Sequence, residues 1–272
     1  MDRQDVCILI NSTPKYFYLL PLQLTMLRRY APMLKWPVYF ATEVPEDPVA
    51  KQLEKEFDVT IIALEKKDSG FLESRLSALQ KLPSSIAYVL PLQEDFLLDR
   101  APDKKNLSDA LFILDTDRSV SSLRLMPCPG PHESDELYVK DKPWRILGEK
   151  NLYTFTYQAT MWRRMDLIAY FKGLLASIAK DFGKRPEADK KYLALTSNIG
   201  ENNYGQKILR TLLPDVLHLC WPRSHSNPNA VYLSPWPYRP TAVVRGKLEP
   251  FAEELFRREG VKFERPATNM ME

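Results

Sequence analysis

The strongest constraint on the fold is the alternation of short apolar runs with amphipathic segments over the first 100 residues. The apolar runs are typical of buried strands and cover residues 6–10, 37–42, 59–64 and 86–92. The segments between them carry apolar residues at helical spacing and cover residues 16–29, 47–57 and 71–82. Strands that alternate with helices build parallel sheets with helices on both faces. We therefore predict an α/β fold with a mostly parallel central sheet flanked by helices.

Polar side chains directly after these strands predict a binding site. They are Asn11 and Ser12, Glu43, Asp68, and the adjacent pair Glu94 and Asp95. Ligands of parallel sheets bind beyond the carboxyl ends of the strands, where such side chains meet. Two carboxylates at the end of a buried strand are costly unless a metal ion, a cationic side chain or a polar substrate accompanies them. We therefore expect these residues to converge on one pocket.

Composition excludes several classes of function. The net charge of +3 is too small to indicate a nucleic-acid surface, and the nine glycines include no Gly-x-Gly-x-x-Gly dinucleotide motif. The three cysteines are far apart and show no zinc spacing, which favours reduced thiols in the cytoplasm. No signal peptide and no apolar run of roughly 20 residues is found, so we expect a cytoplasmic protein without a transmembrane segment.

The second half of the chain is less regular. Apolar spacing predicts helices at 107–115, 165–180, 202–213 and 248–259, with Gly260 placed to end the last of them. Apolar or alternating runs predict strands at 120–126, 152–157 and 261–263. The polar stretch 135–150 is expected to form a loop or a hairpin.

Four stretches carry a resemblance to a known family. They are Ser74–Leu79 with Tyr88–Leu97, then Tyr157–Arg164 with its Gln-x-x-x-Trp pattern, Asn198–Asn203, and Val243–Lys247. Together they resemble GT-A-type glycosyltransferases of the nucleotide-diphospho-sugar transferase superfamily. The resemblance implies a single GT-A-like domain over residues 1–272, with a nucleotide-sugar-binding half at 1–118 and an acceptor-binding half at 119–272. It also implies a nucleotide-diphosphate sugar as donor and a glycan, a lipid-linked molecule or a small molecule as acceptor.

The family's Asp-x-Asp metal motif aligns with Gln93, Glu94 and Asp95. Asp95, and Glu94 as second candidate, are thus the expected ligands of a Mn²⁺ or Mg²⁺ cofactor, which would stabilise the departing diphosphate. Asp95 is for this reason also a candidate catalytic residue. Gln93 departs from the motif and leaves metal dependence open. The structural alternative is that one carboxylate caps the next turn while the other pairs with a surface cation.

Six further residues are candidates for binding the donor. Ser12, Glu43 and Asp68 could bind the base and ribose through hydrogen bonds, or could equally be turn and cap residues. Arg75, Arg245 and Lys247 could bind the diphosphate, and Gly246 would let the backbone approach a phosphate closely. A solvated helix arginine is the alternative for Arg75.

On the acceptor side, Glu201 is the candidate general base for an inverting transfer, with Asp135 and Glu136 in reserve. A carboxylate at the start of a helix stabilises the helix without any catalytic role. This stabilising role is the alternative for Glu201. Gln158 and Trp162 are candidates for binding sugar, with core packing as the alternative for Trp162. The lone His225 could be a late metal ligand or a donor contact.

The sequence thus predicts a metal-assisted glycosyltransferase. The competing hypothesis is a non-catalytic α/β protein that binds nucleotide sugars or carbohydrates, which the altered metal motif keeps open. A nucleotidyltransferase is a third class. Its typical glycine-rich, basic first loop is not matched by residues 11–15, which contain one lysine and no glycine.

Overall fold

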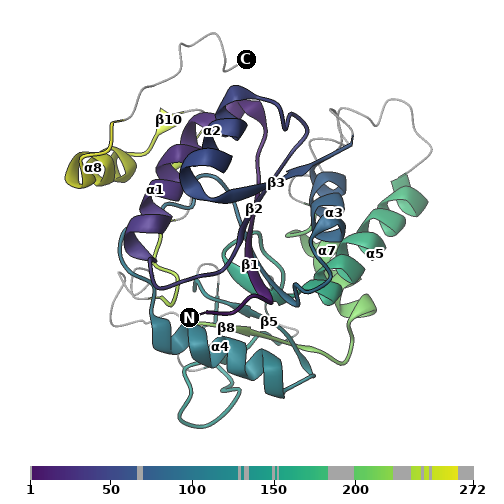
Figure 1. The fold of residues 1–272 in the computed structure, drawn as a ribbon. Coiled ribbons are helices and arrows are strands. Elements are labelled where there is room, and N and C mark those ends of the chain that lie inside the picture. The colour runs from purple at the N-terminus through teal and green to yellow at the C-terminus, as the bar shows by residue number, and fades with distance from the viewer. Residues whose placement is uncertain are drawn as a thin grey trace.

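The computed structural model describes residues 2–65, 70–127, 130–131, 135–148, 151, 153–182, 199–222, 234–239, 242–244 and 247–262. A central sheet of eight strands runs in the order β3-β2-β1-β4-β7-β5-β8-β6, with helices on both of its faces (Figure 1). The predicted α/β fold with a mostly parallel sheet is confirmed. Of the described helices, none is long and apolar enough to cross a membrane.

The first four strands form a wholly parallel half of the sheet. They are β1 (Val6–Asn11), β2 (Val38–Thr42), β3 (Val59–Ala63) and β4 (Tyr88–Leu92). They are connected through the 3-10 helix η1 (Pro14–Leu19) and the helices α1 (Leu20–Tyr30), α2 (Pro48–Phe57) and α3 (Phe71–Lys81). This half follows the alternation seen in the sequence, because every crossover between parallel strands needs a helix-sized connection.

The other half of the sheet is mixed. Its strands are β5 (Val120–Arg124), β6 (Arg145–Ile146), β7 (Thr160–Arg163) and β8 (Leu217–Cys220). Strand β7 is antiparallel to β4 and β5, whereas β5 and β8 are parallel. The helices are α4 (Lys104–Thr116), α5 (Arg164–Phe182), α7 (Asn203–Leu212) and α8 (Pro250–Glu259), and a separate two-stranded sheet joins β9 (Val243–Val244) to β10 (Lys247–Leu248).

Successive residues of β1 enter two different cores. Ile8 and Ile10 pack in a cluster with side chains of α1, α2, α4 and α8, whereas Cys7 and Leu9 pack with side chains of α3, α5 and α7. All four are at most 2% exposed. Alternation of side chains across a pleated strand explains why one continuous apolar run serves both faces. Cys7 is therefore a packing residue.

Local sequence signals set several helix ends. Pro48 lies in the first turn of α2, where the carboxylate of Asp47 accepts the backbone N–H of Val49 at 2.8 Å. Asn202 caps α7 in the same manner through the N–H of Tyr204 at 2.9 Å. Gly260 ends α8 with a φ of 63°, the left-handed conformation that glycine adopts without a steric cost.

The strand predicted at 152–157 is wrong for residues 153–157, which form turns and bends. The buried amide of Gln206 on α7 satisfies this backbone instead: it accepts the N–H of Phe155 and donates to its carbonyl, both at 2.9 Å. Glu201 accepts the N–H of Tyr157 at 2.7 Å. Side chains thus take the place of a neighbouring strand. Residues 261–262 are likewise not in a strand, and residue 263 lies outside the described part.

The start of α5 is fixed by the buried Arg164. Its guanidinium donates to four carbonyl oxygens around the end of α3, those of Leu79, Leu82, Pro83 and Ile86, at 2.6–3.3 Å. The last carbonyls of a helix have no partner within it, so this arginine satisfies groups that burial would otherwise leave unpaired. One side chain thereby joins α3, the segment that leads into β4, and α5.

Candidate functional site

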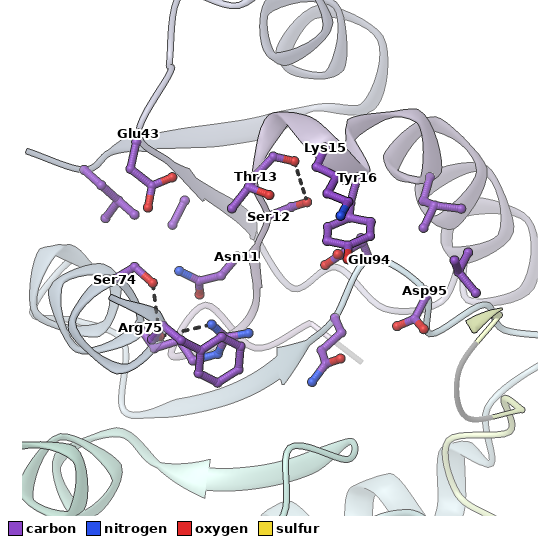
Figure 2. Close-up of a pocket in the computed structure, with 16 residues that line it drawn as sticks. Asn11, Ser12, Thr13, Lys15, Tyr16, Glu43, Ser74, Arg75, Glu94 and Asp95 are labelled. Atoms are coloured by element: carbon purple, nitrogen blue, oxygen red, sulfur yellow. Dashed lines mark hydrogen bonds between the residues drawn. The ribbon is translucent and has the colours of Figure 1, made fainter. Parts of the chain in front are cut away.

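A cleft of about 680 Å³ lies beyond the carboxyl ends of the four parallel strands. Its walls come from the strand ends, the start of η1 and the first turns of α3 (Figure 2). The lining residues are Asn11, Ser12, Thr13, Lys15, Tyr16, Leu19, Ala41, Glu43, Leu64, Phe71, Ser74, Arg75, Gln93, Glu94, Asp95 and Val243. The parallel half of the sheet thus positions most of the cleft.

Five predicted site residues meet in this cleft: Ser12, Glu43, Arg75, Glu94 and Asp95. Figure 2 shows Glu43, Asn11 and Arg75 toward one end, and Lys15, Glu94 and Asp95 toward the other. Asp68, Arg245 and His225 lie outside the described residues. Lys247 is exposed on β10 and is not part of the cleft lining.

Arg75 is held by an aromatic wall. Its Cζ lies 3.3 Å from the ring centroid of Phe71 and 5.6 Å from that of Tyr157, and its Nη1 donates to the carbonyl of Phe71 at 3.2 Å. Burial lowers the pKa of Arg75 to about 10, against the opposing effects of Tyr157, Glu94 and Glu43. The guanidinium stays charged at neutral pH and keeps N–H donors available for a ligand.

Glu94 and Asp95 are half-buried, and both hold their protons more tightly than usual. Burial raises the pKa of Glu94 to about 7, with a further contribution from the charge of Asp95. Burial also raises the pKa of Asp95 to about 6, although the backbone N–H groups of Ala242 and Val243 favour its charged form. The raised pKa values indicate that neighbouring cations do not fully balance the negative charges of the two carboxylates.

Glu94 and Asp95 could supply some, but not all, of the oxygen ligands that a divalent cation requires. Among the described residues, no cluster of three or more histidine, cysteine, aspartate or glutamate side chains could hold a metal ion. Mg²⁺ and Mn²⁺ sites in phosphate-processing proteins, however, use one or two carboxylates and take further oxygen ligands from water and the substrate. Asp95 and Glu94 suit such a shared site, in which phosphate oxygens complete the coordination.

Lys15, Tyr16 and Ser74 line the cleft but were not singled out from the sequence. Lys15 and Tyr16 belong to η1, directly after the strand end that pointed to Ser12, and the ammonium of Lys15 lies 5.8 Å from the ring centroid of Tyr16. Ser74 lies on α3 next to Arg75. The sequence search took only polar residues that directly follow a strand. A search that included the next turn would have found Lys15, the cation opposite Arg75.

The acceptor-side candidates do not line the cleft, although Gln158 and Trp162 line a small cavity that shares Asn11, Arg75 and Gln93 with it. Trp162 on β7 is 1% exposed and packs against Phe155 and His218, with ring centroids 5.8 and 5.4 Å away. This placement is the core packing given above as the alternative, so its indole offers no free face to a sugar. The side chain of Gln158 accepts a hydrogen bond from Tyr238 at 2.6 Å. Burial raises the pKa of Glu201, which does not line the cleft.

No family model and no curated protein matches this chain. Among solved structures, TarS 1-349 of S. aureus is similar at 16% identity with a TM-score of 0.40, over 60% of this chain and 48% of that one. A protein of Desulfovibrio desulfuricans named as a nucleotide-diphospho-sugar transferase is similar at 12% identity and a TM-score of 0.42, over 82% and 80% of the two chains. A cytidylyltransferase of Leptospira borgpetersenii is similar at 12% identity and a TM-score of 0.37, over 74% of each.

This chain thus spans about half the length of the TarS fragment. One of these matches carries the name of the nucleotide-diphospho-sugar transferase class that the sequence resembles. At these identities and TM-scores the likeness assigns neither a reaction nor a residue role to this chain.

Proposed function

We propose that the cleft binds a nucleotide-diphosphate sugar and that the protein transfers the sugar to a hydroxyl group of an acceptor. The observation that carries this proposal is the mixture of charges in one large cleft at the carboxyl ends of parallel strands. Lys15 and Arg75 offer cations to phosphate or to base oxygens, and Glu94 with Asp95 offers a site for a divalent cation.

The two ends of the cleft suit the two parts of such a donor. Glu43, Ser12 and Arg75 suit the base and ribose, because they combine hydrogen-bond acceptors with donors beside the aromatic ring of Phe71. Lys15, Glu94 and Asp95 suit the diphosphate with its cation. Asp68, Arg245 and Lys247 remain proposed donor contacts, as does the cytoplasm as location.

In the proposed reaction the acceptor oxygen forms a bond to C1 of the sugar while the bond from C1 to the diphosphate oxygen breaks. The nucleoside diphosphate leaves with the bonding electron pair, and a base takes the acceptor proton. A bound Mn²⁺ or Mg²⁺ would stabilise the charge of the leaving group. Glu201 is the proposed base, because burial raises its pKa toward the range in which a carboxylate accepts protons efficiently.

The second candidate function is binding of nucleotide sugars without transfer. It is favoured by Gln93 at the first position of the metal motif and by the placement of Glu201 outside the cleft lining. Release of nucleoside diphosphate from a nucleotide sugar in the presence of acceptors distinguishes the two. Glu201→Gln should leave donor binding unchanged and reduce transfer at least 100-fold, an order of magnitude typical of a lost base.

The proposal is tested by calorimetric titration of UDP, GDP, CDP and dTDP, with Mn²⁺ and with EDTA. We expect at least one to bind, more tightly with Mn²⁺. Arg75→Met should weaken that binding by about tenfold or more, because a charge-assisted hydrogen bond contributes about 1.5–3 kcal/mol. Arg257→Met, at an exposed position of α8, is the matched control and should bind as the unmodified protein does. If none of the four nucleotides binds, the proposed function is wrong.

A further inference from the structure

The two candidate metal ligands occupy the centre of one tight turn. Beyond the end of β4, the carbonyl oxygen of Gln93 accepts the backbone N–H of Phe96 at 3.2 Å. This hydrogen bond closes a four-residue turn with Glu94 and Asp95 in the middle, which Figure 2 shows at one end of the cleft. The directions of both carboxylates therefore depend on how this turn is held.

A glutamine of helix α1 holds the start of the turn. The side-chain amide nitrogen of Gln23 donates a hydrogen bond to the carbonyl oxygen of Gln93, 70 residues further along the chain. This carbonyl belongs to the same planar peptide unit as the N–H of Glu94. A fixed carbonyl thus fixes the backbone that leads into Glu94, and with it the direction in which the Glu94 side chain leaves the turn.

The end of the turn is held by a different part of the chain. The carbonyl oxygen of Asp95 accepts the N–H of Ala242 at 3.4 Å. The ring of Phe96 is buried and stacks on that of Tyr238, with the two centroids 4.6 Å apart. The turn is therefore anchored to α1 at its start and to Tyr238 and Ala242 at its end.

A glutamine is an unusual residue at this place in the helix. Gln23 is 2% exposed, and its neighbours Leu22, Leu24 and Met26 are buried apolar residues of α1. Its second polar atom, Oε1, has no hydrogen-bond partner among the described residues. A buried acceptor without a partner costs stability, whereas an apolar side chain would pack here without that cost. A residue that departs from the local packing rule in this way is typical of a functional position.

We propose that Gln23 is a positioning residue for the divalent cation, because it holds the turn that presents Glu94 and Asp95. This inference rests on the proposed function. Gln23 does not line the cleft and acts through the backbone of Glu94. Groups that orient metal ligands from behind contribute strongly to metal binding, and their loss typically lowers metal affinity by about 10–100-fold.

The test compares how strongly Mn²⁺ promotes nucleotide binding. Calorimetry would measure UDP, GDP, CDP and dTDP in EDTA and at a series of Mn²⁺ concentrations, on the unmodified protein and on Gln23→Met. Methionine removes the donor and keeps a similar length. We expect the Mn²⁺ concentration that gives half of the gain in affinity to rise about tenfold or more. The affinity in EDTA should stay unchanged, because Lys15 and Arg75 are not part of the turn.

Thr25→Val is the matched control on the same helix. It removes a hydroxyl that donates to the carbonyl of Pro21 at 2.7 Å, a hydrogen bond within α1. Thr25→Val should keep the Mn²⁺ dependence of the unmodified protein. Gln23→Leu also lacks the donor and takes the place of Gln23→Met if that variant does not fold.

An unchanged Mn²⁺ dependence in the Gln23 variant would overturn this role. An equal loss of affinity in EDTA would overturn it as well, since it would show a general structural effect of the substitution. In both cases the proposed function would stand. Equal binding with Mn²⁺ and with EDTA in the unmodified protein would overturn the role of Gln23 and leave a nucleotide site without a cation. Failure of all four nucleotides to bind would overturn the proposed function together with this inference.

Discussion

At the scale of single residues, Glu94 shows how this cleft departs from an ordinary surface. Its carboxylate follows a largely buried strand, and burial raises its pKa to about 7. Because the folded chain then binds the proton more tightly than the unfolded chain does, ionisation of Glu94 destabilises the fold. A positively charged ligand, such as the proposed divalent cation, would reduce this cost.

The first prediction follows from the sign of this shift. The free energy of unfolding should fall as pH rises from about 4.5, the ordinary pKa, through about 7. Glu94→Gln should reduce the fall between pH 5 and pH 8 by about 1 kcal/mol, a value lowered to allow for solvent screening of a half-buried group. Urea unfolding in EDTA measures it, and Glu46→Gln, at an 84% exposed side chain, is the control. The same pH dependence in Glu94→Gln and the unmodified protein would rule this account out.

At the scale of elements, hydrophobic spacing predicted the parallel half of the sheet, because each strand there is an apolar run between turn residues. The same rule failed at residues 153–157, whose backbone partners are the side chains of Glu201 and Gln206 on a distant segment. It also missed β7 and β8, which have only four residues each and are too short to show a period. When distant residues decide the backbone hydrogen-bond partners of a segment, the sequence of that segment shows no pattern that predicts them.

Arg164 provides the prediction at this scale, since its four carbonyl partners join α3, the segment that leads into β4, and α5. Arg164→Met should lower the free energy of unfolding by about 3 kcal/mol, because it leaves buried carbonyls unpaired. Lys172→Met, at an exposed position of the same helix, should change it by less than about 0.5 kcal/mol. Urea unfolding of both variants checks this, and equal stabilities would mean that Arg164 does not hold the three elements together.

At the scale of the whole molecule, the topology places the candidate site. The four parallel strands end at one edge, so the residues that follow them converge although they are far apart in the sequence. This rule predicted Ser12, Glu43, Glu94 and Asp95 as neighbours. It did not include Lys15, which lies one turn beyond the end of β1, on η1.

This cleft is proposed to hold a diphosphate and a divalent cation together. The most direct test is a crystal structure with Mn²⁺ and the best-binding nucleoside diphosphate, recorded where manganese scatters anomalously. We predict the diphosphate in the cleft and an anomalous peak about 2.2 Å from a carboxylate oxygen of Asp95 or Glu94. A diphosphate bound outside the cleft, or a manganese peak distant from both carboxylates, would show that the cleft is not the site of the diphosphate and its cation.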